Sequence, residues 1–134
     1  MKLAKYSKIY VTGHDAPDFD SFISAYFCEK YFEHFGILAE VRFFDQPDEN
    51  SAKTMRTLGF DFERFIGTDE YLEPLFLVDS YESTHGKVIG AIDHHPTEKE
   101  LGYELYFNEP SSSCALSIVI KRPSFSEINT AQRL

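Results

Sequence analysis

Two near-continuous apolar runs, each ending at an aspartate, constrain the fold of this chain more than any other feature. The first run, EPLFLVDS, closes on Asp79, and the second, KVIGAIDHH, closes on Asp93 and two histidines. A strand with one face in water alternates apolar and polar residues, and these runs do not alternate. They are typical of strands buried on both faces, as in a parallel sheet with helices on each side. The sequence therefore predicts an α/β protein.

The rest of the chain alternates predicted strands and helices around these runs. Further strands are predicted at residues 8–13, 39–44 and 102–109. Apolar residues recur at helical spacing from Ser21 to Phe35, and Gly36 is placed to end that helix. Ser51 is expected to cap a short helix that reaches Leu58, whereas the segment LGFDFERF fits either a helix or a strand. This alternation predicts a parallel, Rossmann-like sheet flanked by helices.

The C-terminal part of the chain changes character after residue 122. The segment SSSCALSIVIK, residues 111–121, predicts a helix with a serine start, and Pro123 stops it. The residues that follow are polar and without periodicity, which is typical of a frayed tail. A chain of 134 residues fits one domain of ordinary size. We therefore expect a single domain over residues 1–122 and an irregular tail over residues 123–134.

Charge and composition exclude several classes of protein. The formal net charge is −9 and no basic stripe is present, so the chain alone is a poor binder of nucleic acid. No apolar stretch approaches the roughly 20 residues that a membrane span requires, and no signal-peptide pattern is present. Cys28 and Cys114 lie in apolar helical patterns, which indicates reduced core thiols rather than a disulfide. We expect a cytoplasmic protein without a membrane partner.

Acidic and histidine side chains gather at the predicted ends of three strands. These residues are His14, Asp18, Asp20, Asp79, Asp93, His94 and His95. Ligands of an open parallel sheet bind beyond the carboxyl ends of its strands, so we expect these side chains to converge on one edge. Bare carboxylates so close together repel one another, whereas divalent cations turn the repulsion into attraction. The sequence therefore predicts a metal site.

The residue types narrow the choice of metal but leave simpler explanations open. Mixed imidazole and carboxylate ligands suit Mn²⁺, Fe²⁺, Co²⁺ or Zn²⁺, and an all-oxygen site suits Mg²⁺ or Ca²⁺ better. The ligands suffice for two ions that share a bridging carboxylate, which activate water and hold phosphoryl oxygens. Taken singly, Asp20 or Ser21 is as well explained by a helix cap, and Asp79 by a loop. Three further residues are expected outside the metal site, in loops or on the surface: Asp15, His34 and His85. For His85 the alternative is contact with the substrate.

Four motifs in combination resemble the successive motifs of the DHH phosphoesterases. They are GHDAPDFDS, LVDSYE, AIDHHP and EPSSSCA, and the resemblance spans roughly residues 9–120. Members of that family are cytoplasmic metal-dependent enzymes: manganese-dependent pyrophosphatases, exopolyphosphatases, phosphodiesterases of nano-RNA and cyclic dinucleotides, and single-strand exonucleases. The resemblance implies the fold of the N-terminal DHH domain, without the second domain that members carry.

The resemblance also implies a set of metal ligands. It implies that His14 and Asp18 bind one ion, and that Asp20 and His94 bind the other. Asp79 would bridge the two ions. The implied cofactor is a divalent metal, Mn²⁺ first, with Mg²⁺, Co²⁺, Fe²⁺ and Zn²⁺ as alternatives.

Catalytic and substrate-binding residues follow from the same resemblance. Asp93 would orient His94 or the local backbone without binding the metal itself. His95 would contact the substrate phosphate or act near the leaving oxygen. Ser112 and Ser113 would lie at a helix N-terminus, where backbone N–H groups favour an anion.

The implied reaction is hydrolysis of a phosphoanhydride, pyrophosphate or polyphosphate, by water that a two-metal centre activates. PDFDSFISA and LVDSYE favour this substrate class. DHHP and EPSSSCA instead favour a phosphodiesterase that acts on short oligonucleotides or cyclic dinucleotides, so both classes stay open. In each case the partner is a small phosphorylated substrate, and nucleic acid enters only as a short oligonucleotide.

Two parts of the family pattern are missing from this sequence. No aspartate follows Asp93, whereas members place a fourth acidic motif on a later strand, and no second domain supplies Lys and Arg. Loss of one donor to the transition state costs on the order of 10²–10³ in rate, so slow turnover is expected. A third interpretation is therefore a truncated, non-catalytic module that binds metal or phosphate, and a fourth is a purely structural α/β domain with incidental polar loops. Apolar surface left bare by the missing domain predicts self-association into a homo-oligomer.

Overall fold

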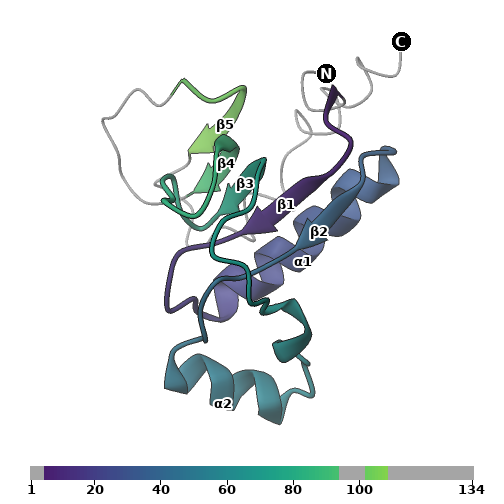
Figure 1. The fold of residues 1–134 in the computed structure, drawn as a ribbon. Helices are drawn as coiled ribbons and strands as arrows, with labels where there is room; N and C mark the ends of the chain where they lie inside the picture. Colours follow the sequence, from purple (N-terminus) through teal and green to yellow (C-terminus); the bar gives the residue numbers. More distant parts are fainter. Residues whose placement is uncertain (1–4, 94–101, 109–134) are drawn as a thin grey trace.

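The centre of the molecule is a five-stranded sheet in which every pair of neighbouring strands is parallel. The computed structural model describes residues 5–93 and 102–108. The strands are β1 (Ile9–Thr12), β2 (Ala39–Val41), β3 (Leu75–Val78), β4 (Val88–Asp93) and β5 (Leu105–Asn108). Their order across the sheet is β2-β1-β3-β4-β5 (Figure 1). The predicted α/β fold with a parallel sheet is confirmed.

The two apolar runs that led to this prediction form the middle of the sheet. All four residues of β3 are buried, and so is every residue of β4 after its first. Side chains alternate between two apolar clusters, with Phe76 in the larger cluster and Leu75 and Leu77 in the smaller one. At Gly90 of β4, a Cβ atom would lie 2.6 Å from the Leu105 carbonyl oxygen and 2.6 Å from a ring carbon of Phe76. The sheet is therefore packed closely on both faces, as the unalternated runs require.

Helix α1 (Phe19–His34) runs along β1, β2 and β3 on one side of the sheet (Figure 1). The helix begins two residues before the predicted start at Ser21, because the carboxylate of Asp18 caps it by accepting a hydrogen bond from the Ser21 N–H at 2.9 Å. The residues that it buries recur at helical spacing: Ser21, Phe22, Ser24, Ala25, Cys28 and Phe32. The Phe22 ring stacks on Phe43 with ring centroids 4.1 Å apart.

Helix α2 (Glu49–Thr57) packs against α1. The prediction that Ser51 caps this helix is wrong, since the cap is Asp48, whose carboxylate accepts a hydrogen bond from the Ser51 N–H at 2.8 Å. A carboxylate is the stronger acceptor and stands where the free N–H groups of the first turn point. Two more bonds join the starts of the helices: Asp48 N–H to the Pro17 carbonyl at 3.2 Å, and Phe19 N–H to the Ser51 hydroxyl at 3.1 Å.

The remaining predicted elements have different outcomes. The ambiguous segment LGFDFERF contains the 3₁₀-helix η2 (Glu63–Phe65). The strand predicted at 39–44 is shorter, because β2 ends at Val41, and Phe43 forms an isolated bridge with Ile66. The predicted helix at 111–121 and the predicted tail at 123–134 lie outside the described residues.

Of the two cysteines predicted to be core thiols, the structure describes Cys28. Cys28 is fully buried, and burial raises the pKa of its thiol. Cys114 lies outside the described residues. Among the helices that the structure describes, none is long and apolar enough to cross a membrane.

Candidate metal centre

The candidate site lies where β1 and β3 end side by side. β1 pairs with β2 on one side and with β3 on the other, so the strand order reverses at β1 and β3, where open sheets bind ligands. Thr12 at the end of β1 pairs with Leu77 of β3, and the Asp79 N–H donates to the Ile92 carbonyl of β4 at 2.9 Å. The ends of β1, β3 and β4 therefore lie at one edge of the sheet, and the histidines predicted beyond β4 lie outside the described residues.

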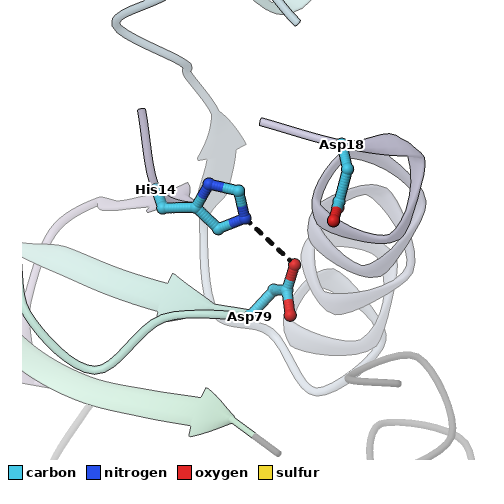
Figure 2. Close-up of side chains that lie close together, drawn as sticks. All are labelled: His14, Asp18 and Asp79. Atoms are coloured by element: carbon cyan, nitrogen blue, oxygen red, sulfur yellow. Dashed lines mark hydrogen bonds and ion pairs between the residues drawn. The ribbon is translucent and has the colours of Figure 1, made fainter. Parts of the chain in front are cut away.

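Three side chains from three different elements meet at this edge. His14 follows β1, Asp18 caps α1, and Asp79 follows β3. Each offers one ligand atom, and these atoms all lie within 4.8 Å of one another. Figure 2 shows the three side chains pointing toward one another, and a dashed line joins His14 to Asp79. His14 Nε2 lies 3.2 Å from Asp79 Oδ2. An imidazole and two carboxylates at this spacing form a ligand set that a divalent cation can bind.

Gly13 allows the end of β1 to approach its neighbours closely enough for this meeting. A Cβ atom at this position would lie 3.1 Å from Ser21 Cβ, 3.1 Å from a ring carbon of Phe43 and 3.2 Å from the Val78 carbonyl oxygen. A side chain at this position would require these neighbours to shift by a few tenths of an ångström. The glycine that opens the motif GHDAPDFDS therefore sets the position of His14.

Asp79 reaches the site with an uncommon backbone conformation. Its φ angle is +57°, in the left-handed region, where Asp is one of the better tolerated residues apart from glycine. The residue is 2 % exposed, and burial, together with repulsion from Asp20 and Asp18, raises the pKa of its carboxyl. Hydrogen bonds from His14 and Ser21 oppose that rise. A cation would relieve the repulsion that the buried carboxylate meets here.

His14 is held in a state that suits a metal ligand once its proton is lost. Its Nδ1 atom lies 2.8 Å from the Asp15 carbonyl oxygen, which can only accept a hydrogen bond. The hydrogen bond to Asp79, helped by that carbonyl and the nearby carboxylates, raises the pKa of His14 to about 9 against the effect of burial. Metal-ligating histidines commonly donate one ring N–H to a carbonyl and bind with the other nitrogen. Here Nε2 is the nitrogen that faces the carboxylates.

Ser21 lies at the centre of the three candidate ligands, although the sequence suggested only a helix cap. Its hydroxyl oxygen is 2.9 Å from Asp79 Oδ2, 3.1 Å from Asp18 Oδ1 and 3.2 Å from His14 Nε2. The side chain is fully buried. The signal for this role was its place three residues after Asp18, which turns it toward the cap and the strand end.

The other predicted site residues have separate outcomes. Asp20 accepts a hydrogen bond from the Ser24 hydroxyl at 2.9 Å and lies outside the group of three, although its charge acts on Asp79. Asp93 is fully buried at the end of β4. The remaining predicted residues lie outside the described residues: His94, His95, Ser112 and Ser113.

Two residues that were expected outside the site lie directly beside it. The Asp15 side chain is 66 % exposed, yet its Oδ1 atom is 2.9 Å from His85 Nε2. With His14, both line a cavity of about 230 Å³ formed by residues 13–15 and 82–85. Because 70 residues separate Asp15 from His85, no local pattern could have paired them.

Comparison with known proteins points to one family. No curated protein matches the chain. A family model does match: the DHH family, N-terminal domain, over residues 8–132. The matched range includes both apolar runs, the motif that carries His14 and Asp18, and the aspartate and histidine triplet at residues 93–95. Since that match covers nearly the whole chain, the protein belongs to the DHH family.

Proposed function

We propose that this domain hydrolyses a small phosphorylated substrate with a water molecule that a divalent metal activates. Membership of the DHH family indicates phosphoesterase chemistry in general terms. The single observation that carries the proposal is the group formed by His14, Asp18 and Asp79, whose ligand atoms lie within 4.8 Å of one another. A buried Asp79 between two further acids is otherwise a costly arrangement.

The donor set fits a resident metal ion. His14 Nε2 and the carboxylates of Asp18 and Asp79 would hold it. One imidazole with two carboxylates suits Mn²⁺, Co²⁺, Fe²⁺ and Zn²⁺, and the family resemblance puts Mn²⁺ first, with Mg²⁺ as a further alternative. When bound, such an ion lowers the pKa of water and polarises a phosphoryl oxygen. The Asp15 carbonyl would keep the His14 ring oriented by accepting its Nδ1 proton.

A second ion is proposed from the family resemblance. Asp20 and His94 would hold it, with Asp79 bridging the two ions. Asp20 lies near enough for its charge to raise the pKa of Asp79, which supports a place beside the bridging carboxylate. Asp93 would orient His94, and His95 would contact the substrate phosphate.

The proposed substrate classes are two, and each is supported by different motifs. The motifs around Asp20 and Asp79 support a phosphoanhydride, pyrophosphate or polyphosphate, as the first class. The motifs around His95 and Ser112 support a phosphodiester, a short oligonucleotide or a cyclic dinucleotide, as the second. Ser112 and Ser113 would hold the phosphate in either case. We propose that the protein works in the cytoplasm and self-associates.

One assay tests the function and the choice of substrate together. The full chain is supplied with Mn²⁺ and offered pyrophosphate, a short oligonucleotide and an aryl phosphodiester. Asp79→Asn removes the charge of one metal ligand at nearly constant shape. We expect it to lower the rate at least a hundredfold, because loss of a residue that only hydrogen-bonds to a ligand already costs ~10–100-fold. Asp48→Asn, at the start of the other helix, is the matched control and should keep the wild-type rate.

Metal binding is measured separately from turnover. Elemental analysis after incubation with Mn²⁺ and removal of free ion should find at least one ion per chain. Retained metal without hydrolysis of any substrate would point to the non-catalytic module instead. A chain that retains no metal, with His14 and Asp79 intact, would contradict the proposed function.

A further inference from the structure

The peptide group that joins Asp15 to Ala16 makes a hydrogen bond at each of its two ends. Its carbonyl oxygen, which belongs to Asp15, lies 2.8 Å from His14 Nδ1. Its N–H, which belongs to Ala16, donates to Asp45 Oδ2 at 2.8 Å. A trans peptide is planar, so its C=O and N–H point in opposite directions. The partner that fixes the N–H therefore also fixes the direction of the carbonyl that His14 meets.

Ala16 holds this peptide in a conformation that alanine seldom adopts. Its φ angle is +46°, in the left-handed region, which is uncommon for residues with a Cβ atom. Such a conformation costs free energy and persists where the surrounding contacts hold it. A half-turn of the peptide would return φ to negative values and would turn the carbonyl away from His14. The hydrogen bond to Asp45 opposes that turn, because the Ala16 N–H would lose its partner.

Asp45 is itself fixed in the segment that follows β2. Its second carboxylate oxygen, Oδ1, accepts a hydrogen bond from the Gln46 N–H at 2.8 Å. Two residues earlier, the Phe43 N–H donates to the Phe65 carbonyl at 2.7 Å, and the Phe43 carbonyl accepts from the Gly67 N–H at 3.2 Å. The carboxylate is therefore oriented by its own backbone, on a segment that is bonded to the chain after it. It can hold Ala16 in place rather than follow its movements.

A second side chain holds the same short segment at Asp15. Asp15 Oδ1 lies 2.9 Å from His85 Nε2, and an ionised carboxylate can only accept, so His85 is the donor. Phe44, the neighbour of Asp45, stacks on the His85 ring with centroids 4.4 Å apart and planes 8° from parallel. His85 acts on a side chain, whereas Asp45 acts on the peptide itself. Asp45 is therefore the residue that sets the direction of the carbonyl.

The direction of this carbonyl matters for the candidate metal centre. With Nδ1 turned to the Asp15 carbonyl, His14 Nε2 lies 3.2 Å from Asp79 Oδ2 and 3.2 Å from the Ser21 hydroxyl oxygen. A histidine that binds metal through one ring nitrogen is oriented by the partner of the other. A carbonyl that turned away would leave the His14 ring free to rotate out of the centre.

We propose that Asp45 is a positioning residue of the metal centre, which orients His14 through the peptide between residues 15 and 16. In this role Asp45 contacts neither the metal nor the substrate. The inference rests on the proposed function, because it takes His14 to be a metal ligand. It adds a residue from the segment after β2 to a centre whose ligands follow β1 and β3 or cap α1.

The affinity for Mn²⁺, measured by calorimetric titration of the full chain, separates the acceptor of Asp45 from its charge. Asp45→Ala removes both, and we expect the affinity to fall about tenfold. Asp45→Asn removes the charge but keeps an acceptor oxygen, and a neutral hydrogen bond is roughly half as strong, so the loss should be about threefold. Glu33→Ala removes one charge at the far end of α1 and should keep the wild-type affinity. Equal losses in the two Asp45 variants, or none in Asp45→Ala, would overturn the inference.

A second substitution tests the peptide itself. Glycine adopts positive φ without the cost that a Cβ atom imposes, so Ala16→Gly added to Asp45→Ala should recover about threefold in affinity. If Asp45 acted through its charge, the glycine would recover nothing, and that result would contradict the inference. Circular dichroism checks that the variants fold. Should Asp45→Ala be unfolded, Asp45→Leu, which has a similar branched shape and no acceptor, takes its place in both experiments.

The orientation of His14 is also measured without metal, by NMR. Nuclear Overhauser effects between the ring protons of His14 and the β-protons of Ser21 report whether the ring lies beside the Ser21 hydroxyl. We expect them in the wild type and in Asp45→Asn, and we expect them to be weaker in Asp45→Ala. Their absence from the wild type, or equal strength in Asp45→Ala, would overturn the inference.

The outcomes separate this inference from the proposed function. A wild-type chain that binds Mn²⁺ but hydrolyses nothing loses the hydrolase, and the affinities still test Asp45. A wild-type chain that binds no Mn²⁺ loses the proposed function, and the metal-free spectra then decide whether Asp45 orients His14.

Discussion

Helices α1 and α2 begin with the same arrangement of an aspartate and a serine, and only one of them faces a candidate metal site. In α1 the Asp18 carboxylate accepts from the Ser21 N–H at 2.9 Å and from its hydroxyl at 3.1 Å. In α2 the Asp48 carboxylate accepts from the Ser51 N–H and from its hydroxyl, both at 2.8 Å. The local chemistry of the two caps is the same.

The surroundings of the two caps differ completely. Asp18 meets His14 and Asp79, whereas hydrogen bonds from Ser51 lower the pKa of Asp48. Within residues 5–93 and 102–108, the group around Asp18 is the one that could hold a metal ion. A cap motif is therefore a local feature, and the site arises from the strand ends that the sheet brings to one of the two caps.

The largest expected effect is on metal affinity, when the charge of each cap residue is removed. Asn caps a helix about as well as Asp, so Asp18→Asn and Asp48→Asn should both keep their helices. We expect Asp18→Asn to weaken Mn²⁺ binding more than about a hundredfold, because a ligand charge is lost. Asp48→Asn should leave the affinity unchanged. Calorimetric titration measures both, and equal affinities in the two variants would break the comparison.

A second pair of variants tests the hydroxyl that each cap contains. Ser21→Ala removes a group within 3.2 Å of all three candidate ligands, and we expect metal affinity to fall about 10–100-fold. Ser51→Ala removes the same group from the other cap and should not affect metal binding. Competition with a metal-binding dye would report the two affinities. A loss of similar size in both variants would mean that only helix stability had been measured.

A third change concerns stability rather than metal. Asp48→Ala removes a cap with no other task, and the free energy of unfolding should fall by about 1 kcal/mol. In metal-free protein Asp18→Ala should cost less, because it also removes a charge that repels the buried Asp79. Urea denaturation in the presence of EDTA measures both. A greater loss in Asp18→Ala would show that repulsion at the site is weak.

The smallest effect is a difference in pH dependence. The pKa of His14 is raised to about 9 by Asp79, so its contribution to stability is complete below about 6.5 and is lost as the pH rises to about 9. The lowered pKa of Asp48 acts in the acid range, where stability is lost as the pH falls below the ordinary value of 3.8. Melting temperatures without metal should fall by about a few degrees between pH 6.5 and 9. His14→Gln should remove that fall, and Asp48→Asn should not.

The sequence predicted the sheet well because its strongest signals came from burial. Unalternated apolar runs required two covered faces, and β3 and β4 have them. The helix starts were less accurate, since both Asp18 and Ser21, like Asp48 and Ser51, are good caps, and only the N–H groups of the folded first turn select the carboxylate.

Only part of the site was predicted, and that part followed from the geometry of a parallel sheet rather than from burial. His14, Asp18 and Asp79 could be grouped because strand ends of a parallel sheet converge. The pairing of Asp15 with His85 depends on a distance that no spacing in the sequence encodes. The place of Ser21 three residues after Asp18 was a signal, but its contact with Asp79 depends on the fold. Asp20 was predicted as a metal ligand from its position in the motif. That position did not reveal that its carboxylate accepts a hydrogen bond from the Ser24 hydroxyl.

The distance along the chain between His14 and Asp79 has a consequence for folding kinetics. Their side chains meet across 65 residues, and only after β1 and β3 have paired. An ion that binds both can stabilise the native state but not a chain in which that pairing is still absent. If the pairing forms late, bound metal should leave the folding rate nearly unchanged and slow unfolding instead. The metal would then stabilise the folded sheet without speeding its formation.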